Sequence, residues 1–346
     1  MTQTSTIHEL DIAHAPVATD PHAAAAEWLS LGRPVALATV IETWGSAAVP
    51  TGGQMAIAGE EMFQGSVSGG CVEADVIAAA MDVIESGVPQ TLAFGITDET
   101  AWRAGLACGG KVRVHVTRLM PGRDDALFQH INEARAQRTA LVIETHLKSG
   151  AHKVLTRSDE VSTDVATALD RGVCQLVSVD GDDVFLHALT PPPRLVIVGA
   201  THIAQVLVTL CNAIGYDVTV LDPRGAFTSN ARFAAGAVTT AWPEAQLAQL
   251  LDDPFSSVVT LTHAANIDDE ALEIALRSSC RYIGALGSRK THEKRLARLA
   301  AAGFGDADLQ RIKAPVGLDI GAKSAGEIAV AILGQVIAAF RDGRVR

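Results

Sequence analysis

The sequence predicts an α/β protein in which an N-terminal α/β domain precedes a Rossmann-type domain with a doubly wound parallel sheet. After Pro191-Pro192-Pro193, buried strand patterns alternate with helix patterns almost to the end of the chain. The first of these strands, RLVIV, runs directly into a glycine turn at Gly199. Hydrophobic residues make up 48% of the 346 residues and aromatic residues only 4%. This composition favours helices packed on a largely parallel sheet over an aromatic-rich β-sandwich.

The N-terminal half is predicted to form a short lead-in and one compact domain. Residues 1–20 have neither a basic region nor an apolar core, so we expect a flexible N-terminus without a secretory signal. Apolar spacing predicts a helix over 22–31, a buried strand over 34–42 and a later helix, VEADVIAAAMDVIES, that stops at Gly87. Two further strand patterns, TLAFGITD and KVRVHVTRL, complete an α/β domain over residues 21–120.

The second half is predicted to begin after a proline-rich linker. Residues 121–193 alternate helix-like and strand-like pieces and end in three prolines, which stiffen the chain because proline fixes its own backbone angle. The patterns DVTVLD, SSVVTLTH and RYIGALG then continue the strands, and DDEALEIALRSS and KTHEKRLARLAAAG read as helices between them. This alternation predicts a Rossmann-type domain over residues 194–346.

Charge and cysteine content limit the partners that the chain can have. The net charge of −11 argues against nucleic acid, whose binding requires clustered Lys and Arg. The most apolar helix pattern, AGEIAVAILGQVIAAF, is too short to span a bilayer. Five scattered cysteines without CxxC spacing are poor for a disulfide framework and favour the reducing cytoplasm. Many apolar helix faces with few aromatic residues make a homodimer the expected assembly.

The glycine turn of the second half resembles a dinucleotide fingerprint with one departure. GATHIA, which contains Gly199, Thr201 and His202, has Thr201 where a second glycine normally lets a pyrophosphate approach the backbone. Asp222 ends the next strand, where a carboxylate can bind a ribose hydroxyl. NAD(P) or another adenine nucleotide is therefore a candidate ligand, and a Rossmann-type fold without a dinucleotide remains the alternative.

Further polar residues are expected at the carboxyl ends of the same parallel strands. His263 ends SVVTLTH, and a lone histidine of this kind is more often a packed or surface residue than a ligand contact. Ser288 is predicted to cap the next helix, whose free N–H groups beside Arg289 would form an anion site. The alternative for Arg289 is a solvated helix start.

The most unusual stretch of the first half is GSVSGGCVE, which runs into a predicted helix. Gly70 and Glu73 have the spacing of an N-cap and the third helical residue, so Cys71 is expected at a helix N-terminus, where its thiol pKa can fall. Thiolate, hydroxyl groups such as that of Ser68 and the N–H groups around Gly69 suit a ligand that carries phosphate together with sulfur or a thiophilic metal. Cys71 as a small buried residue is the alternative. A second glycine-flanked thiol is Cys108 in ACGG.

These motifs together resemble one known family. TWGSA, GSVSGGCVE, ACGG, GATHIAQ, LDPR, LTH, IGALGSRKTH and PVGLDIGA are similar, in this order, to the XdhC/CoxI family of accessory proteins for molybdenum hydroxylases such as xanthine dehydrogenase. The resemblance implies a chaperone, rather than a catalyst, that binds molybdenum cofactor as molybdopterin or its dinucleotide form. It also implies that a cysteine desulfurase supports sulfuration of the cofactor before delivery to the hydroxylase apoenzyme.

The resemblance also implies site residues. Cys71 is the implied anchor of the cofactor and contact of its molybdenum, and Gln54 and the Arg224 of LDPR join the candidate cofactor-binding residues. Two other functions stay open on the sequence. One is an NAD(P)-dependent oxidoreductase in which Cys71 or His263 reacts, and the other is a nucleotide-binding scaffold without chemistry.

Overall fold

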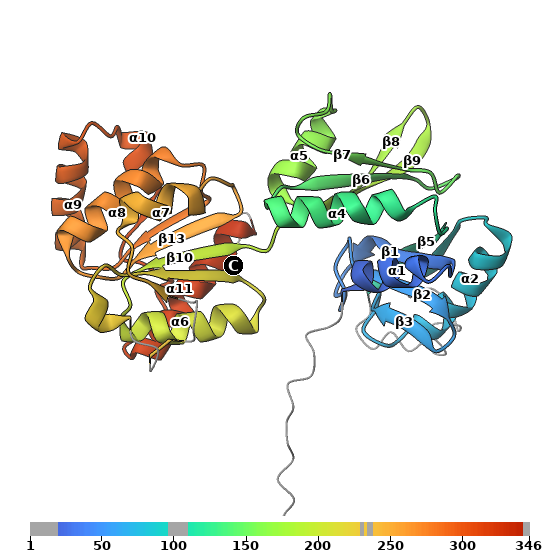
Figure 1. Ribbon diagram of the computed structural model, residues 1–346, viewed down its shortest axis with the longest axis horizontal. Helices are drawn as coiled ribbons and strands as arrows, with labels where there is room; N and C mark the ends of the chain where they lie inside the picture. Colours follow the sequence, from blue (N-terminus) through green and yellow to red (C-terminus); the bar gives the residue numbers. More distant parts are fainter. Residues whose placement is uncertain (1–19, 96–109, 229–231, 234–237, 342–346) are drawn as a thin grey trace, which may run out of the picture. The chain divides into compact units, whose positions relative to one another are not determined.

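The computed structural model describes residues 20–95, 110–228, 232–233 and 238–341, and the chain divides into two compact units, Met1–Leu189 and Thr190–Arg346 (Figure 1). The elements of the first unit are α1 Pro21–Ser30, β1 Val35–Trp44, β2 Gln54–Gly59, β3 Met62–Gly65, α2 Glu73–Ser86, β4 Gln90–Phe94, β5 Lys111–Leu119, α4 Asp125–Gln137, β6 Leu141–His146, β7 His152–Leu155, α5 Thr163–Arg171, β8 Gln175–Val179 and β9 Asp182–Leu189.

The first unit contains two antiparallel sheets. One has five strands in the order β3-β2-β1-β5-β4, and the other has four in the order β7-β6-β9-β8. The tight turns between β2 and β3 and between β8 and β9 allow only antiparallel pairing, because a parallel pair needs a long crossover. The largely parallel architecture that composition favours therefore holds only for the second unit.

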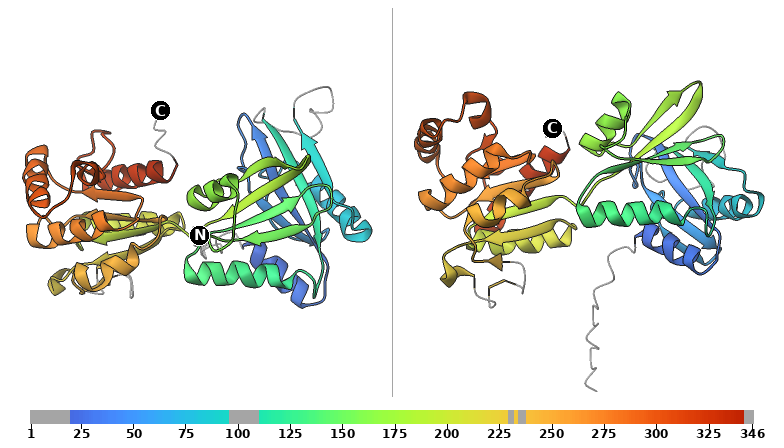
Figure 2. Two further views of the ribbon diagram at one scale, coloured as in Figure 1. Left: turned by 90° about the horizontal axis from the view of Figure 1, so that it is seen from above. Right: turned by 45° about the horizontal axis from the view of Figure 1, so that its top comes forward.

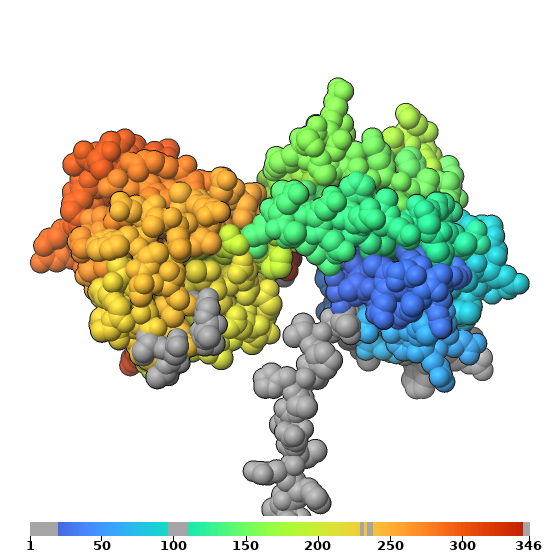
Figure 3. Space-filling model, in the orientation of Figure 1, coloured from blue at the N-terminus to red at the C-terminus, as the bar shows by residue number. Residues whose placement is uncertain are grey.

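The two sheets of the first unit share a hydrophobic core (Figure 2). The ribbons of the two sheets lie against each other in Figure 2. Leu37 of β1 packs in one cluster with Leu141 and Ile143 of β6, and Ile41 packs with Phe185 of β9. On its other face the five-stranded sheet is covered by α2 through apolar residues spaced along the helix. Helices α1 and α4 lie side by side on the surface of the unit (Figure 3). The strands that follow residue 120 thus complete the core of the first unit.

The second unit is the predicted Rossmann-type domain. Its elements are β10 Arg194–Val198, α6 His202–Ala213, β11 Asp217–Leu221, the 3-10 turn η1 Gly225–Phe227, β12 Val238–Thr239, α7 Pro243–Leu250, β13 Ser256–Thr260, α8 Ala265–Arg277, β14 Tyr282–Ala285, α9 Arg289–Ala301, α10 Asp306–Leu309, β15 Ile312–Lys313 and α11 Ala325–Phe340. All described strand pairs are parallel, in the order β12-β11-β10-β13-β14-β15. Helices α6 and α11 cover one face, and α7 and α8 cover the other (Figure 1).

The strand order reverses between β10 and β13, which makes this edge the place where ligands bind in such sheets. Local signals fix the helix ends around it. Thr201, Ser288 and Ser324 are N-caps whose side chains accept a backbone N–H, and Ser324 forms a complete capping box with Glu327. None of the described helices is both long and apolar enough to cross a membrane.

Candidate functional site

The loop before α2 folds around the carboxylate of Glu73. Helix α2 begins at Glu73 itself with Val72 as its N-cap, so the expected placement of Gly70 at the N-cap is wrong. The Glu73 side chain instead turns back over the preceding residues. Its two oxygens accept the backbone N–H groups of Val67, Ser68, Gly69, Gly70 and Val72 at 2.9–3.3 Å.

Both serine hydroxyls of the loop also donate to this carboxylate. Ser66 Oγ lies 2.7 Å and Ser68 Oγ 2.6 Å from Glu73 oxygens. Burial opposes ionisation of Glu73, but these hydrogen bonds outweigh it and lower the pKa of the carboxyl group to about 2. The N–H groups that the sequence suggested for a phosphate are therefore used by the protein's own anion.

Cys71 is the free thiol that the loop presents to solvent. Its side chain is exposed, and its backbone N–H donates to Ser68 Oγ at 3.0 Å, which ties it to the Glu73 network. A cavity of about 30 Å³ beside it brings together three of the motif segments recognised in the sequence. Its lining consists of Ser46, Ala47, Ala48, Val49, Val67, Ser68, Cys71, Gly110, Lys111 and Val112.

Two features of this cavity were not predicted from the sequence. Lys111 lines the same cavity as Cys71, and its position directly after CGG was the available signal. Gly110 is required by close backbone approach, because a Cβ atom there would lie 2.2 Å from the Ser46 carbonyl oxygen. The spacing of TWGSA and CGG in the sequence does not reveal that the two segments touch.

The other predicted residues of the first unit lie elsewhere. Gln54 is buried with its side chain donating to Thr39 Oγ1 at 2.9 Å, and it does not line the cavity beside Cys71. Cys108 lies outside the described residues. Among the described cysteines, Cys174 is half-buried and Cys211 and Cys280 are buried.

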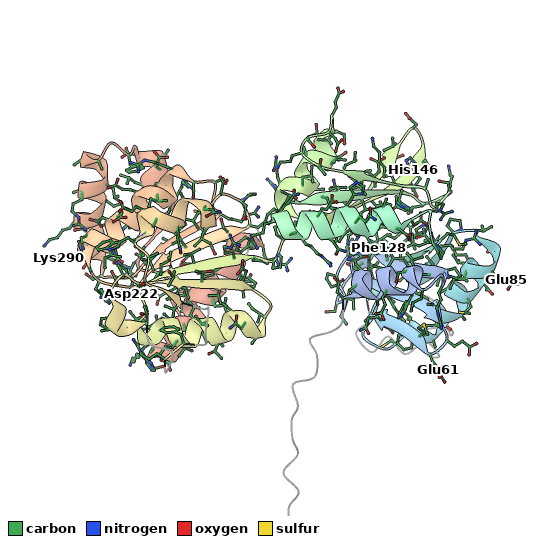
Figure 4. All side chains as sticks on the ribbon, in the orientation of Figure 1. Glu61, Glu85, Phe128, His146, Asp222 and Lys290 are labelled. Atoms are coloured by element: carbon green, nitrogen blue, oxygen red, sulfur yellow. The ribbon has the colours of Figure 1, made fainter. Side chains whose placement is uncertain are left out.

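In the second unit the glycine turn is closed by Asp222. This carboxylate is fully buried and accepts the Ala200 N–H at 2.8 Å. It also accepts the N–H of Arg224 at 3.0 Å and two guanidinium N–H groups of Arg224 at 2.8–2.9 Å. Burial opposes ionisation, yet the bonds from Arg224 and Ala200 lower the pKa of Asp222. The carboxylate expected to hold a ribose, labelled in Figure 4, thus accepts four hydrogen bonds from protein groups.

The neighbouring residues complete this edge of the parallel sheet. Gly199 has φ +118°, and a Cβ there would lie 2.9 Å from the Thr262 backbone nitrogen, so the turn packs tightly on the end of β13. Thr201 Oγ1 accepts the Ala204 N–H at 3.3 Å, which makes Thr201 a helix cap. His202 lies 3.2 Å from the side chain of Gln205. His263 is exposed with φ +61°, a left-handed conformation that non-glycine residues rarely adopt.

The next strand end carries Ser288 and Arg289. Ser288 caps α9 as predicted, and Arg289 and Lys290 are exposed, with Lys290 projecting from the unit (Figure 4). The sequence analysis did not identify Arg295, which lies about one and a half turns after Arg289 in α9, as a buried residue of this region. Its buried guanidinium donates to the Leu286 carbonyl at 3.0 Å and lies 3.9 Å from Asp268. Within the described ranges, no group of three or more His, Cys, Asp or Glu side chains could hold a metal ion.

Family models match both units of the chain. The model described as the XdhC and CoxI family matches residues 28–95, which include the Cys71 loop. The model described as the XdhC Rossmann domain matches residues 195–336, which include the Asp222 edge.

Named relatives match most of the chain. A probable xanthine dehydrogenase subunit of Bacillus subtilis is 28% identical over 87% of this chain and 92% of its own length. The molybdenum cofactor insertion chaperone PaoD of Escherichia coli is 27% identical over 90% of this chain and 85% of its own. A crystal structure described as a xanthine dehydrogenase from Bacillus halodurans shares the fold, with a TM-score of 0.69 at 24% identity over 94% of this chain and 97% of that one. With both motif-bearing regions matched in sequence order, the chain belongs to the XdhC and CoxI family.

Proposed function

We propose that this protein binds molybdenum cofactor and inserts it into a molybdenum hydroxylase of the xanthine dehydrogenase type. The observation that carries the proposal is the exposed thiol of Cys71, which lies where three motif segments meet. The adjoining cavity of about 30 Å³ is too small to enclose the cofactor, so the cofactor lies on the exposed surface that presents this thiol. A thiolate is the ligand type preferred by soft metals and metal–sulfur groups. The relative named as a molybdenum cofactor insertion chaperone, which this chain matches over most of its length, points to the same cargo.

The residues of the first unit divide into two roles in this proposal. Cys71 contacts the metal–sulfur part of the cargo, and Lys111 on the same cavity wall attracts its phosphate. The backbone N–H groups of the loop do not fit a phosphate, because Glu73 accepts five of them. Glu73, Ser66 and Ser68 therefore hold the loop in place, and Gln54 has no part in the site.

For the second unit, taken by itself, we propose a contact with a nucleotide. His263, Ser288 and Arg289 lie after neighbouring parallel strands, at the edge where such sheets bind ligands. Asp222 and Thr201 are engaged in closing the glycine turn and capping α6. This occupation argues against the NAD(P)-dependent oxidoreductase, which would require Asp222 for the ribose.

The remaining parts of the proposal rest on the cysteine content, on the apolar helix faces and on what the family resemblance implies. The protein works in the cytoplasm as a homodimer, receives sulfur for the cofactor from a cysteine desulfurase and then meets the hydroxylase apoenzyme. A pull-down with each purified partner, with and without loaded cofactor, would test these contacts. Light scattering would give the mass of the assembly.

Copurification tests the central claim. The chain is expressed in a host that makes molybdenum cofactor, and pterin fluorescence and metal analysis are read on the purified protein. We expect Cys71→Ala to retain less than about a tenth of the wild-type cofactor, which is the effect of losing one strong contact worth about 1.4 kcal/mol. Cys174→Ala is the matched control in the same unit and should retain it.

Three results would contradict the proposal. Equal cofactor in both cysteine variants would show that Cys71 is no anchor. A bound nicotinamide nucleotide without pterin would favour the oxidoreductase. An adenine nucleotide alone would favour the scaffold.

A further inference from the structure

A row of polar side chains crosses the five-stranded sheet of the first unit. By strand register Gln54 of β2 is opposite Thr39 of β1, Thr39 is opposite His115 of β5, and His115 is opposite Thr91 of β4. Directly opposite residues project from the same face of a sheet. Gln54 Nε2 donates to Thr39 Oγ1 at 2.9 Å, and Thr91 Oγ1 lies 2.9 Å from His115 Nδ1.

This row borders a cavity between the two sheets. The cavity has a volume of about 30 Å³ and is lined by side chains of both, including Gln54 and His115 from the first sheet and His187 from β9 of the second. Gln54 is 9%, His115 3% and His187 5% exposed. One polar atom of each, namely Gln54 Oε1, His115 Nε2 and His187 Nδ1, is buried without a hydrogen-bond partner among the described residues.

The size and chemistry of the cavity select its ligand. A pocket for a metabolite has a volume of roughly 300 Å³ or more. A buried water needs a cavity volume of only about 10–15 Å³ and forms about three hydrogen bonds. Unpaired buried polar atoms are costly, so three of them around one small cavity indicate a bound polar molecule. His115, His152 and His187 all line the cavity, but among the described residues no group of three or more His, Cys, Asp or Glu side chains could hold a metal ion.

The histidines are neutral at physiological pH, which determines their hydrogen-bonding roles. Burial, with a smaller effect of Arg113, lowers the pKa of His115 to about 4. Burial, with a smaller effect of His22, lowers the pKa of His187 to about 3, and the backbone of Gly52 hydrogen-bonds this ring. Nδ1 of His187 has no partner, so we assign the proton of the neutral ring to Nε2, which leaves Nδ1 as an acceptor.

We propose that this cavity is a binding site for ordered water and that one water molecule bridges the three unpaired atoms. The water donates its two hydrogens to Gln54 Oε1 and His187 Nδ1 and accepts the N–H of His115 Nε2. His115 then uses Nδ1 to accept the hydroxyl hydrogen of Thr91. The three unpaired atoms then each have a partner, and the water links the two sheets whose strands lie on either side of residue 120.

Histidine tautomers and a crystal structure of the full chain test this site. ¹⁵N NMR at neutral pH should show both His115 and His187 protonated on Nε2, and high-resolution electron density should show a water within about 3.2 Å of all three atoms. In Gln54→Leu the number of long-lived waters counted by ¹⁷O relaxation should fall by at least one. Thr117→Val, which alters another polar residue of the lining, should keep the bridging water.

Several outcomes would overturn the proposal. These are a dry cavity that binds xenon, a metal found there by elemental analysis, and a His115 protonated on Nδ1 only. Should Gln54→Leu fail to fold, the tautomer measurement on the unaltered protein still decides, because the bridging geometry requires the Nε2–H form.

Discussion

The chain contains two glycine-rich turns that lead into helices, one before α2 and one before α6, and each is closed by a carboxylate of the protein itself. Glu73 accepts five backbone N–H groups in the first, and Asp222 accepts the Ala200 N–H in the second. The surroundings differ. Glu73 is only partly buried, with the exposed thiol of Cys71 two residues away, whereas Asp222 is fully buried and paired with Arg224.

This difference separates a loop that presents a functional group from a turn that stabilises a fold. Around Glu73 the carboxylate fixes a backbone that leaves the Cys71 side chain exposed. Both carboxylate oxygens of Asp222 accept hydrogen bonds from protein groups, namely the Ala200 N–H and the backbone and guanidinium of Arg224. A glycine-rich turn before a helix therefore does not by itself indicate an anion site, because an internal carboxylate can occupy the same N–H groups.

The largest expected effect is on stability in the second turn. Asp222→Asn leaves the Arg224 guanidinium and buried N–H groups without their charged partner, so the second unit should lose about 3 kcal/mol of unfolding free energy. Asp217→Asn is a matched control at the opposite end of β11, where the ion pair with Arg194 is partly exposed, and it should cost less than about 1 kcal/mol. Urea unfolding measures both. Similar values for the two variants would show that Asp222 does not hold the turn.

The second effect concerns thiol reactivity. Burial raises the pKa of Cys174 and of Cys280, and it raises the pKa of Cys211 to about 12. Cys71 is exposed, so iodoacetamide at neutral pH should modify it at least about a hundredfold faster than Cys211, because the thiolate is the nucleophile. Peptide mass spectrometry over a time course gives each rate. If iodoacetamide modified Cys71 as slowly as the buried thiols, the loop before α2 would not present a reactive thiol.

A third effect should come from the Glu73 network. Glu73→Gln places a donor group against backbone donors, and we expect a loss of about 2 kcal/mol in the first unit. Because the folded pKa of about 2 lies below the ordinary value of 4.5, the stability from ionised Glu73 is present above pH 4.5 and is lost as the pH falls towards 2.

In Glu73→Gln the unfolding free energy should therefore fall less steeply than in the wild type as the pH drops from 4.5 towards 2. Glu85→Gln, at an exposed position of the same helix, is the control and should keep both the wild-type stability and the wild-type pH dependence over this range. Unfolding measured at several pH values gives both results. Identical curves for Glu73→Gln and Glu85→Gln would mean that the network has no energetic role.

The smallest expected effect is at the cap of α6. Thr201→Ala removes the acceptor of the Ala204 N–H and should cost about 1 kcal/mol, whereas Thr201→Gly should cost a few tenths. Thermal unfolding of the two variants separates them. If both variants were equally stable, the threonine at the second glycine position would need another explanation.

Features that depend on near neighbours along the chain could be predicted from the amino-acid sequence. Alternating strand and helix patterns after Pro193 predicted the parallel sheet, which the strand order confirms. The cap Ser288 and the stop at Gly87 were predicted and are confirmed, because capping depends on residues within one turn. The motifs also identified the family.

The pairing of polar groups, in contrast, depends on how the chain folds in three dimensions. The sequence placed Asp222 at a strand end, but its pairing with Ala200 arises because β10 and β11 are adjacent parallel strands. The contact between Ser46 and Gly110 joins segments far apart in the chain, and so does the row from Gln54 to Thr91. The periodicity of apolar residues predicts whether a side chain is buried, but it does not predict its hydrogen-bond partners. Those partners depend on strand register and on how the sheets stack.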